Sequence, residues 1–269
     1  LKIDVSGKTE VDGSGDGSVD KGKAAVRVEG GGDATIELDG ANELKSGSHN
    51  AGLEKNEHES KGTLTIKDDN DTKGSLTAEG GKDGAGIGGG YESGAGNIEI
   101  TGGTVEAVGG EGAAGIGGGV YGPGRDIEIS GGKVSATGGS YSGDPRPGAA
   151  GLGDGAGAWS EIDPDAPPSN PNHIYISGDA EVEAKAGAST GGKTAAIGGG
   201  MVGEIPNDAL SDDDHKVTGG SLTRLNADGT EMEGMGYDYT STPTPQPEED
   251  EDDDDDDEND APNTQAGEV

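Results

Sequence analysis

A glycine-rich phrase occurs twice in succession, which constrains the chain more than any other feature of its sequence. The first copy, residues 84–110, reads GAGIGGGYESGAGNIEITGGTVEAVGG, and the second, residues 112–139, reads GAAGIGGGVYGPGRDIEISGGKVSATGG. Similarity of a sequence to itself at a fixed, short interval is typical of proteins that stack copies of one structural unit. The phrase therefore indicates either such a stack or a glycine-rich linker without a fold.

The same phrase recurs along most of the chain. The apolar residue of its G-I-G-G-G element is found at Leu53, Ile87, Ile116, Leu152 and Ile197. Each copy also holds three short segments in which apolar and polar residues alternate, separated by glycine pairs. In one copy the alternating apolar positions are Ile98, Ile100, Val105, Ala107, Ala114 and Ile116.

Alternation with a period of two is the pattern of a strand with one buried face, and glycine pairs suit the corners between strands. Ile87 and Ile116 lie 29 residues apart, a length that accommodates three short strands and three corners. We therefore predict an all-β fold, a right-handed parallel β-helix (solenoid) of about five to six coils. Its handedness follows from the general rule for parallel crossovers. Ile87, Ile116, Leu152 and Ile197 should form one inner ladder.

Composition alone argues for disorder. Hydrophobic residues make up 28% of the chain, there is no Phe, and the formal net charge is −36. Chains of this kind rarely bury enough apolar surface to offset the entropy of ordering. Disorder and another all-β fold are therefore the alternatives, but stacked coils bury small residues jointly, so the repeat favours the solenoid.

The pattern divides the chain into three parts. Residues 1–35 lack the glycine phrase and are predicted to form an N-terminal capping coil, and residues 36–240 carry the β-helix repeats. Residues 241–269 are rich in Thr and Pro and include an unbroken acidic run over 248–258, which predicts a disordered linker or stalk. Because the sequence opens on Leu1 and shows no signal peptide, we expect it to be part of a longer protein.

Charge and composition exclude several classes of function. A strongly acidic chain repels nucleic acid, and no apolar run is long enough for membrane insertion. The absence of Cys excludes a disulfide framework, a thiolate zinc site and a cysteine nucleophile. We expect a monomer.

The quoted phrases, together with GTLTI, GSLTAEGG and the opening AAVRVEGGGDATIELDGANELKSG, resemble a repeat of large exported surface proteins of Gram-positive gut bacteria. The resemblance covers residues 24–200. That family is usually described as carbohydrate-binding. The resemblance implies an extracellular protein, attached to the cell wall at the cell surface or secreted, and the acidic tail is similar to the stalks that separate such modules from the wall.

Tyrosines follow three of the glycine phrases: Tyr91, Tyr121 and Tyr141. Tyr91 and Tyr121 occupy similar places in consecutive copies, so their rings could stack about 5 Å apart, the spacing of neighbouring strands, and present flat faces to sugar rings. The alternative, which the pattern favours, is that each Tyr covers a glycine-rich corner.

The longest insertion, residues 140–173, holds Trp159 and Arg146. Insertions in a solenoid gather on one face, often the binding face. The two residues are candidates for a sugar-binding platform; equally, Trp159 could only hold a Pro-rich loop against the coil.

The segment DGSGDGSVD is a candidate calcium site, and calcium is the one cofactor that the sequence suggests. Asp12, Ser14, Asp16 and Asp20 fit part of a calcium loop, but Lys23 occupies the position of its bidentate Glu. The pattern favours a solvated acidic turn.

We expect no enzymatic activity, because the His and Arg residues are scattered and do not recur together. The predicted function is a cell-surface binding module (adhesin) for carbohydrate. One alternative is a module that binds a host protein, for example an immunoglobulin. Its contacts would come from outward residues of the coils: Glu99, Thr104, Glu106, Glu128 and Lys133. The other alternative is a structural spacer with no ligand.

Overall fold

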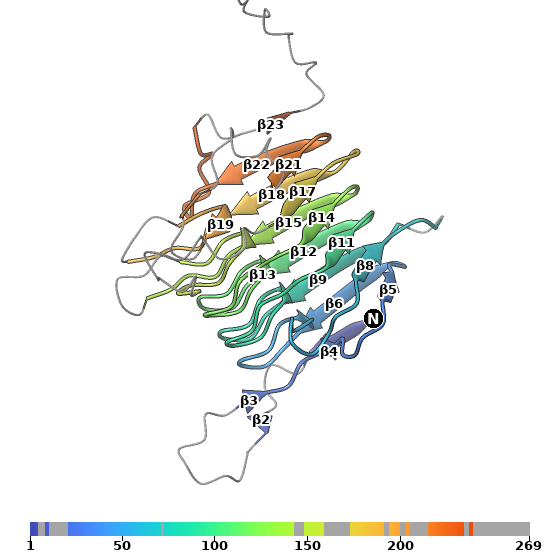
Figure 1. Ribbon diagram of the computed structural model, residues 1–269, viewed down its shortest axis with the longest axis vertical. Helices are drawn as coiled ribbons and strands as arrows, with labels where there is room; N and C mark the ends of the chain where they lie inside the picture. Colours follow the sequence, from blue (N-terminus) through green and yellow to red (C-terminus); the bar gives the residue numbers. More distant parts are fainter. Residues whose placement is uncertain are drawn as a thin grey trace, which may run out of the picture.

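The chain forms a right-handed parallel β-helix, shown by a computed structural model (Figure 1). The structure describes residues 1–4, 9–10, 21–70, 73–142, 148–158, 173–190, 194–199, 203–204, 215–233 and 237–238. Within these residues the chain winds through three sheets in turn, and each circuit stacks on the one before. They contain no helix, and so none that could cross a membrane.

The first sheet has eight strands and contains the longest ones. Its order is β1 (Lys2–Asp4), β6 (Ala41–Lys45), β9 (Ser75–Glu79), β12 (Thr104–Val108), β15 (Lys133–Thr137), β18 (Glu181–Lys185), β22 (Ser221–Leu225) and β23 (Tyr237–Asp238). All of these strands pair in parallel except the last, which runs antiparallel to β22.

The second and third sheets complete each circuit. The second sheet comprises β4 (Val26–Arg27), β7 (Leu53–Glu54), β10 (Ile87–Gly88), β13 (Ile116–Gly117), β16 (Leu152–Gly153), β19 (Ile197–Gly199) and β20 (Gly203–Glu204). The third comprises β5 (Ala34–Glu37), β8 (Leu64–Lys67), β11 (Ile98–Ile100), β14 (Ile127–Ile129), β17 (Ile174–Ile176) and β21 (His215–Val217). A separate antiparallel pair, β2 (Thr9–Glu10) and β3 (Lys21–Gly22), interrupts the first circuit.

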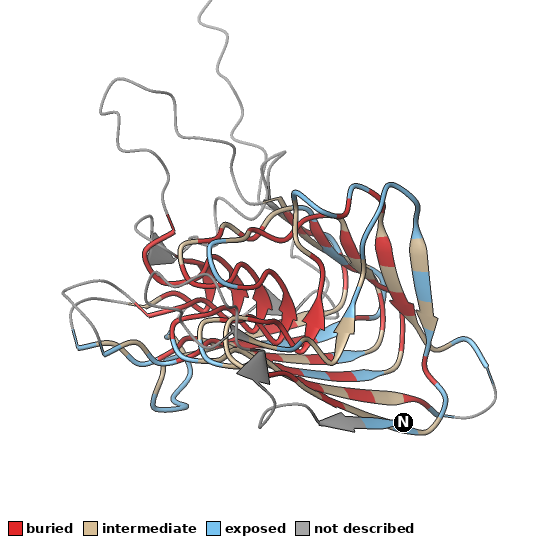
Figure 2. Ribbon diagram, turned by 90° about the horizontal axis from the view of Figure 1, so that it is seen from below, coloured by how far each residue is buried: buried red, intermediate tan, exposed pale blue. Residues whose placement is uncertain are grey.

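The core consists of ladders of like residues. The ladder of the second sheet is Leu53, Ile87, Ile116, Leu152 and Ile197, paired in register and fully buried. Buried and outward residues alternate along the strands of the other two sheets, as Figure 2 shows. The predicted fold class, the alternating segments and the inner ladder are therefore confirmed, and small residues fill the core because many coils share it.

Four of the five ladder residues, all but Leu53, are followed by glycine, and the geometry of the backbone explains why. Gly88, Gly117 and Gly153 adopt φ angles of 131°, 139° and 128°, a region that side chains rarely occupy. A Cβ atom at Gly117 would also lie 1.9 Å from the carbonyl oxygen of Gly153 in the next coil. Glycine therefore recurs at this position for two reasons: the backbone conformation favours it, and consecutive coils approach too closely for a side chain.

One coil departs from this phrase and buries charge instead. Glu54 pairs in register with Gly88, and its side chain is 1% exposed. Its carboxylate lies 2.7 Å from Nε of Arg27 and accepts a hydrogen bond from the backbone N–H of Ala51 at 3.0 Å. In the next coil the N–H of Ala85 bonds instead to the backbone carbonyl of Gly89. The carboxylate therefore replaces a backbone acceptor that the other coils use.

The ends of the solenoid differ from its middle. The first circuit consists of β1, β4 and β5, whose strands pair with β6, β7 and β8. Val26, Val28, Ala34 and Ile36 are only partly buried there, because the described part of the chain stacks no earlier coil on them. The predicted tail over 241–269 lies outside the described residues.

Candidate functional site

A pocket of about 510 Å³ lies on the corner between the first and second sheets, within the size range of small-ligand sites. Three consecutive coils contribute the residues that follow β12, β15 and β18. The lining consists of small and hydroxyl-bearing residues with one carboxylate and one ring: Gly109, Gly110, Glu111, Gly139, Ser140, Tyr141, Ser142, Ala188, Ser189 and Thr190.

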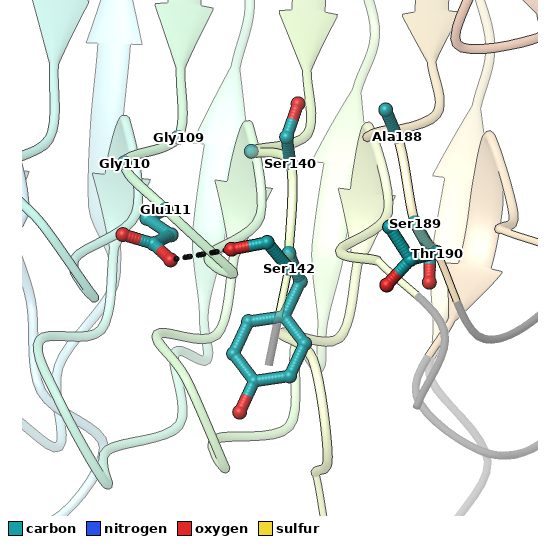
Figure 3. Close-up of a pocket in the computed structure, with 10 residues that line it drawn as sticks. Gly109, Gly110, Glu111, Ser140, Ser142, Ala188, Ser189 and Thr190 are labelled. Carbon is teal, nitrogen blue, oxygen red and sulfur yellow. Dashed lines mark hydrogen bonds between the residues drawn. The ribbon is translucent and has the colours of Figure 1, made fainter. Parts of the chain in front are cut away.

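The polar groups of this corner pocket come from different coils. Figure 3 shows Glu111 on one side, Ser140 and Ser142 in the middle, and Ser189 and Thr190 on the other side. The Ser142 hydroxyl donates a hydrogen bond to Oε1 of Glu111 at 3.4 Å. Hydroxyl groups both donate and accept, whereas a carboxylate only accepts. The pocket therefore offers mixed hydrogen-bonding groups to a ligand.

Tyr141 supplies the ring. Its backbone pairs with Ser189, and its N–H donates to the Ala188 carbonyl at 2.8 Å, so the next coil fixes its position. The ring packs on Gly112, where a Cβ atom would lie 2.8 Å from its Cδ2 atom. Gly112 has a φ of 73°, so glycine is favoured there on conformational grounds as well. Tyr141 thus covers a glycine corner and also borders the pocket.

Tyr91 and Tyr121 form a second aromatic group, to which His49 also belongs. Their ring centroids are 5.9 Å apart with an interplanar angle of 72°, and the centroids of His49 and Tyr91 are 5.0 Å apart at 50°. Tyr91 is the more exposed tyrosine, at 38%. Burial raises the pKa of its hydroxyl above the ordinary value, and Glu92 raises it further, so the phenol remains protonated at neutral pH.

These rings meet edge to face, so the stack of Tyr91 and Tyr121 that the sequence offered as one of two interpretations does not form. The cause is an offset of one residue. Ile87 pairs with Ile116, which places Tyr91 level with Val120 and Glu92 level with Tyr121. The N–H of Glu92 accordingly bonds to the carbonyl of Val120 at 2.8 Å. No residue is inserted, because Ala95 still pairs with Gly124 and Ile98 with Ile127. Tyr121 stands one position later in its coil than Tyr91 does, and this places the second ring out of line with the first.

Several candidate residues from the sequence cannot be placed. Trp159 and Arg146, and the calcium candidates Asp12, Ser14, Asp16 and Asp20, lie outside the described residues. Among the residues that the structure does describe, no group of three His, Asp or Glu side chains is arranged to hold a metal ion.

The outward residues proposed for protein binding occupy the faces of two sheets. Thr104 pairs in register with Lys133 on the first sheet, and Glu99 with Glu128 on the third. Glu99 accepts a hydrogen bond from the Thr65 hydroxyl at 2.9 Å. A second, smaller pocket of about 270 Å³ lies on the third sheet. Its lining is Thr63, Asn97, Ile98, Glu99, Asp126, Glu128 and Tyr175.

Sequence reasoning missed the side chains that line the corner pocket apart from Tyr141. Glu111 and Ser140 each follow a glycine pair, Gly109–Gly110 and Gly138–Gly139, at equivalent points of consecutive coils. A search for the residue after each corner would have found them. His49 was set aside as scattered, although its position is equivalent to Asp83, whose carboxylate lies 3.8 Å from its Nδ1 atom.

Comparison with known proteins gives one family match. A family model described as a β-helix repeat matches residues 72–91 and 98–120, which include Tyr91 and Glu111. No curated protein and no solved structure matches the chain. Over the matched residues the chain is therefore similar to β-helix repeats, in agreement with a module built from such repeats.

Proposed function

We propose that this β-helix is a non-enzymatic carbohydrate-binding module, an adhesin exposed on the cell surface or secreted. The observation that carries the proposal is the corner pocket, in which a tyrosine ring lies beside hydroxyl groups and a carboxylate. Sugars are bound in this way: apolar ring faces pack on aromatic side chains, and hydroxyl groups exchange hydrogen bonds with polar ones. The resemblance of the repeats to exported surface proteins supports the same function and location.

We expect the Tyr141 ring to contribute more to glycan affinity than any other group in the pocket. Replacing Tyr141 with Ala removes the apolar surface on which a sugar would pack, and buried aromatic residues dominate many binding sites. We expect the Tyr141→Ala protein to bind its best glycan about 10- to 100-fold more weakly than the wild type, equivalent to about 1.4 to 2.8 kcal/mol. Tyr141→Phe keeps the ring and should lose less.

The test is a glycan array of the full chain, followed by titration of the strongest glycan into each variant. Tyr175→Ala is the matched control, because it removes a tyrosine from the third sheet, away from the corner pocket. Loss of binding in Tyr141→Ala alone supports the proposal. Equal losses in both variants would refute the assignment of the site.

Binding of a host protein is the second candidate function. The favouring observation is the pocket on the third sheet, where Glu99 and Glu128 lie beside Tyr175 on three neighbouring strands. An acidic surface of this kind suits a basic partner, and such binding weakens with salt. A host protein captured from mucosal secretions, and still bound after deglycosylation, would favour it. If the chain binds no glycan on the array and captures no host protein, a structural spacer is favoured.

A further inference from the structure

The corner pocket has a marked charge asymmetry. Glu111 is the one charged side chain among the residues that line it in the described part of the chain. Glu111 forms an ion pair with Lys82 from the preceding coil, whose Nζ lies 3.7 Å from its Oε2 atom and whose side chain is 59% exposed. Exposed ion pairs at such distances contribute little. The pocket therefore presents a carboxylate that Lys82 only weakly compensates.

Glu111 is hydrogen-bonded to the coils on both sides, once through its carboxylate and once through its backbone, and its side chain is 44% exposed. Its Oε1 atom accepts the hydrogen bond from Ser142 in the next coil, and the Glu111 carbonyl accepts one from the N–H of Asp83 in the preceding coil at 3.2 Å. A carboxylate acceptor in the pocket lining favours ligand hydroxyl groups, which can donate to it. A ligand carboxylate could only repel it, and like charges brought together are a common source of specificity.

From this arrangement we propose that the corner pocket selects uncharged glycans and rejects glycans that carry a carboxylate, and that Glu111 determines this selectivity. The inference rests on the proposed carbohydrate-binding function and narrows its ligand class to neutral sugars, excluding uronic acids and sialic acids. The net charge of −36 acts in the same direction at long range, but Glu111 acts within the pocket.

Paired glycans test the proposal. Each pair consists of a neutral glycan and an acidic form of the same linkage, either the corresponding uronic acid or the same chain capped with sialic acid. The measured quantity is the affinity of the full chain for the neutral glycan divided by its affinity for the acidic one. In the Glu111→Gln protein, which keeps a polar side chain of the same size, we expect this ratio to fall about three- to tenfold, because one charge at contact distance is removed.

Two further variants separate a local effect from a general change in charge. Glu183 on the first sheet also accepts a hydrogen bond from a serine hydroxyl, Ser135, at 3.4 Å, but it does not line the pocket. Glu183→Gln should therefore leave the ratio at the wild-type value. Lys82→Gln should raise it, because the remaining compensation of Glu111 is lost.

The outcomes are distinct. A ratio that falls only in Glu111→Gln supports the proposal. It is overturned if the wild type binds both members of the pairs equally well, or if Glu111→Gln and Glu183→Gln change the ratio to the same extent. If the wild type binds no glycan of either kind, the proposed carbohydrate-binding function itself fails, and the selectivity fails with it.

Discussion

The Gly117→Ala protein is expected to be less stable than the wild type by about 3 to 5 kcal/mol, or to fail to form its central coils. Two costs combine at this position. The φ angle of 139° is strained for any side chain, and the added Cβ would lie 1.9 Å from the carbonyl oxygen of Gly153. Since each coil of a solenoid contacts only its neighbours, a disturbed contact in the middle weakens the coupling of both halves.

Two other glycines separate these costs. Gly30 also has a positive φ, 101°, but a Cβ there would meet no atom within 4 Å, so Gly30→Ala should cost only about 1 kcal/mol of strain. Gly31 has neither problem, and Gly31→Ala should change stability by less than about 0.5 kcal/mol. Urea denaturation followed by circular dichroism measures all three. A Gly117 variant no less stable than the Gly30 variant would contradict the close approach of coils.

The second large effect is expected from the ion pair between Arg27 of the first coil and the buried Glu54 of the second. Arg27→Ala leaves the Glu54 carboxylate buried without its cation, and breaking such a pair costs several kcal/mol. We expect a smaller loss, about 2 to 3 kcal/mol at pH 7, because the Arg27 side chain is 39% exposed and Glu54 keeps its bonds from Ala51 and Asn56.

This loss should depend on pH in a defined direction. Burial raises the pKa of Glu54 above its ordinary value of 4.5, whereas the neighbouring Arg27 lowers it. Removing Arg27 therefore raises this pKa further. A carboxyl group with a raised pKa in the folded state contributes stability that is fully present below pH 4.5 and is lost as the pH rises through the folded pKa. The destabilisation of Arg27→Ala relative to the wild type should accordingly be largest at pH 7 and shrink towards pH 4.5.

The free energies of unfolding of the variants are compared with that of the wild type at the same pH. The contribution of the many other carboxylates therefore cancels from each difference. The double variant Arg27→Ala/Glu54→Gln has no titrating group at this site, whereas wild-type Glu54 has a raised pKa, so the loss of the double variant relative to the wild type should not grow between pH 4.5 and pH 7 as that of the single variant does. An equal loss for Arg27→Ala at pH 7 and pH 4.5 would show that the Glu54 carboxylate is hydrated and not buried.

The fold could be predicted from the sequence because its determinants are local and repeated. The ladder from Leu53 to Ile197 recurs in every copy, four of its five residues are followed by glycine, and stacking requires only that copies align. Glu54 could not be interpreted in the same way. It stands where other coils have glycine, and its partner Arg27 comes from the first circuit, which lacks the phrase.

The candidate site was less predictable because it depends on register and not on the repeat alone. Tyr121 stands one position later in its coil than Tyr91 does, so the two rings meet edge to face and do not stack. The corner pocket depends on Glu111, Ser142 and Thr190, which share no motif and meet only because their coils are adjacent. The side chains that line this pocket differ between copies, whereas an alignment of the copies shows the residues that are the same.

The location of a bound glycan tests the account most directly. Hydrogen exchange of the full chain, measured with and without the neutral glycan that binds it best, reports this location without a substitution. We predict slower exchange at the amides around the corner pocket, including those of Gly112 and Tyr141, which bond to the carbonyls of Ser140 and Ala188. Protection confined to the third sheet, or no protection in any part of the chain, would contradict the proposal that this corner is the binding site.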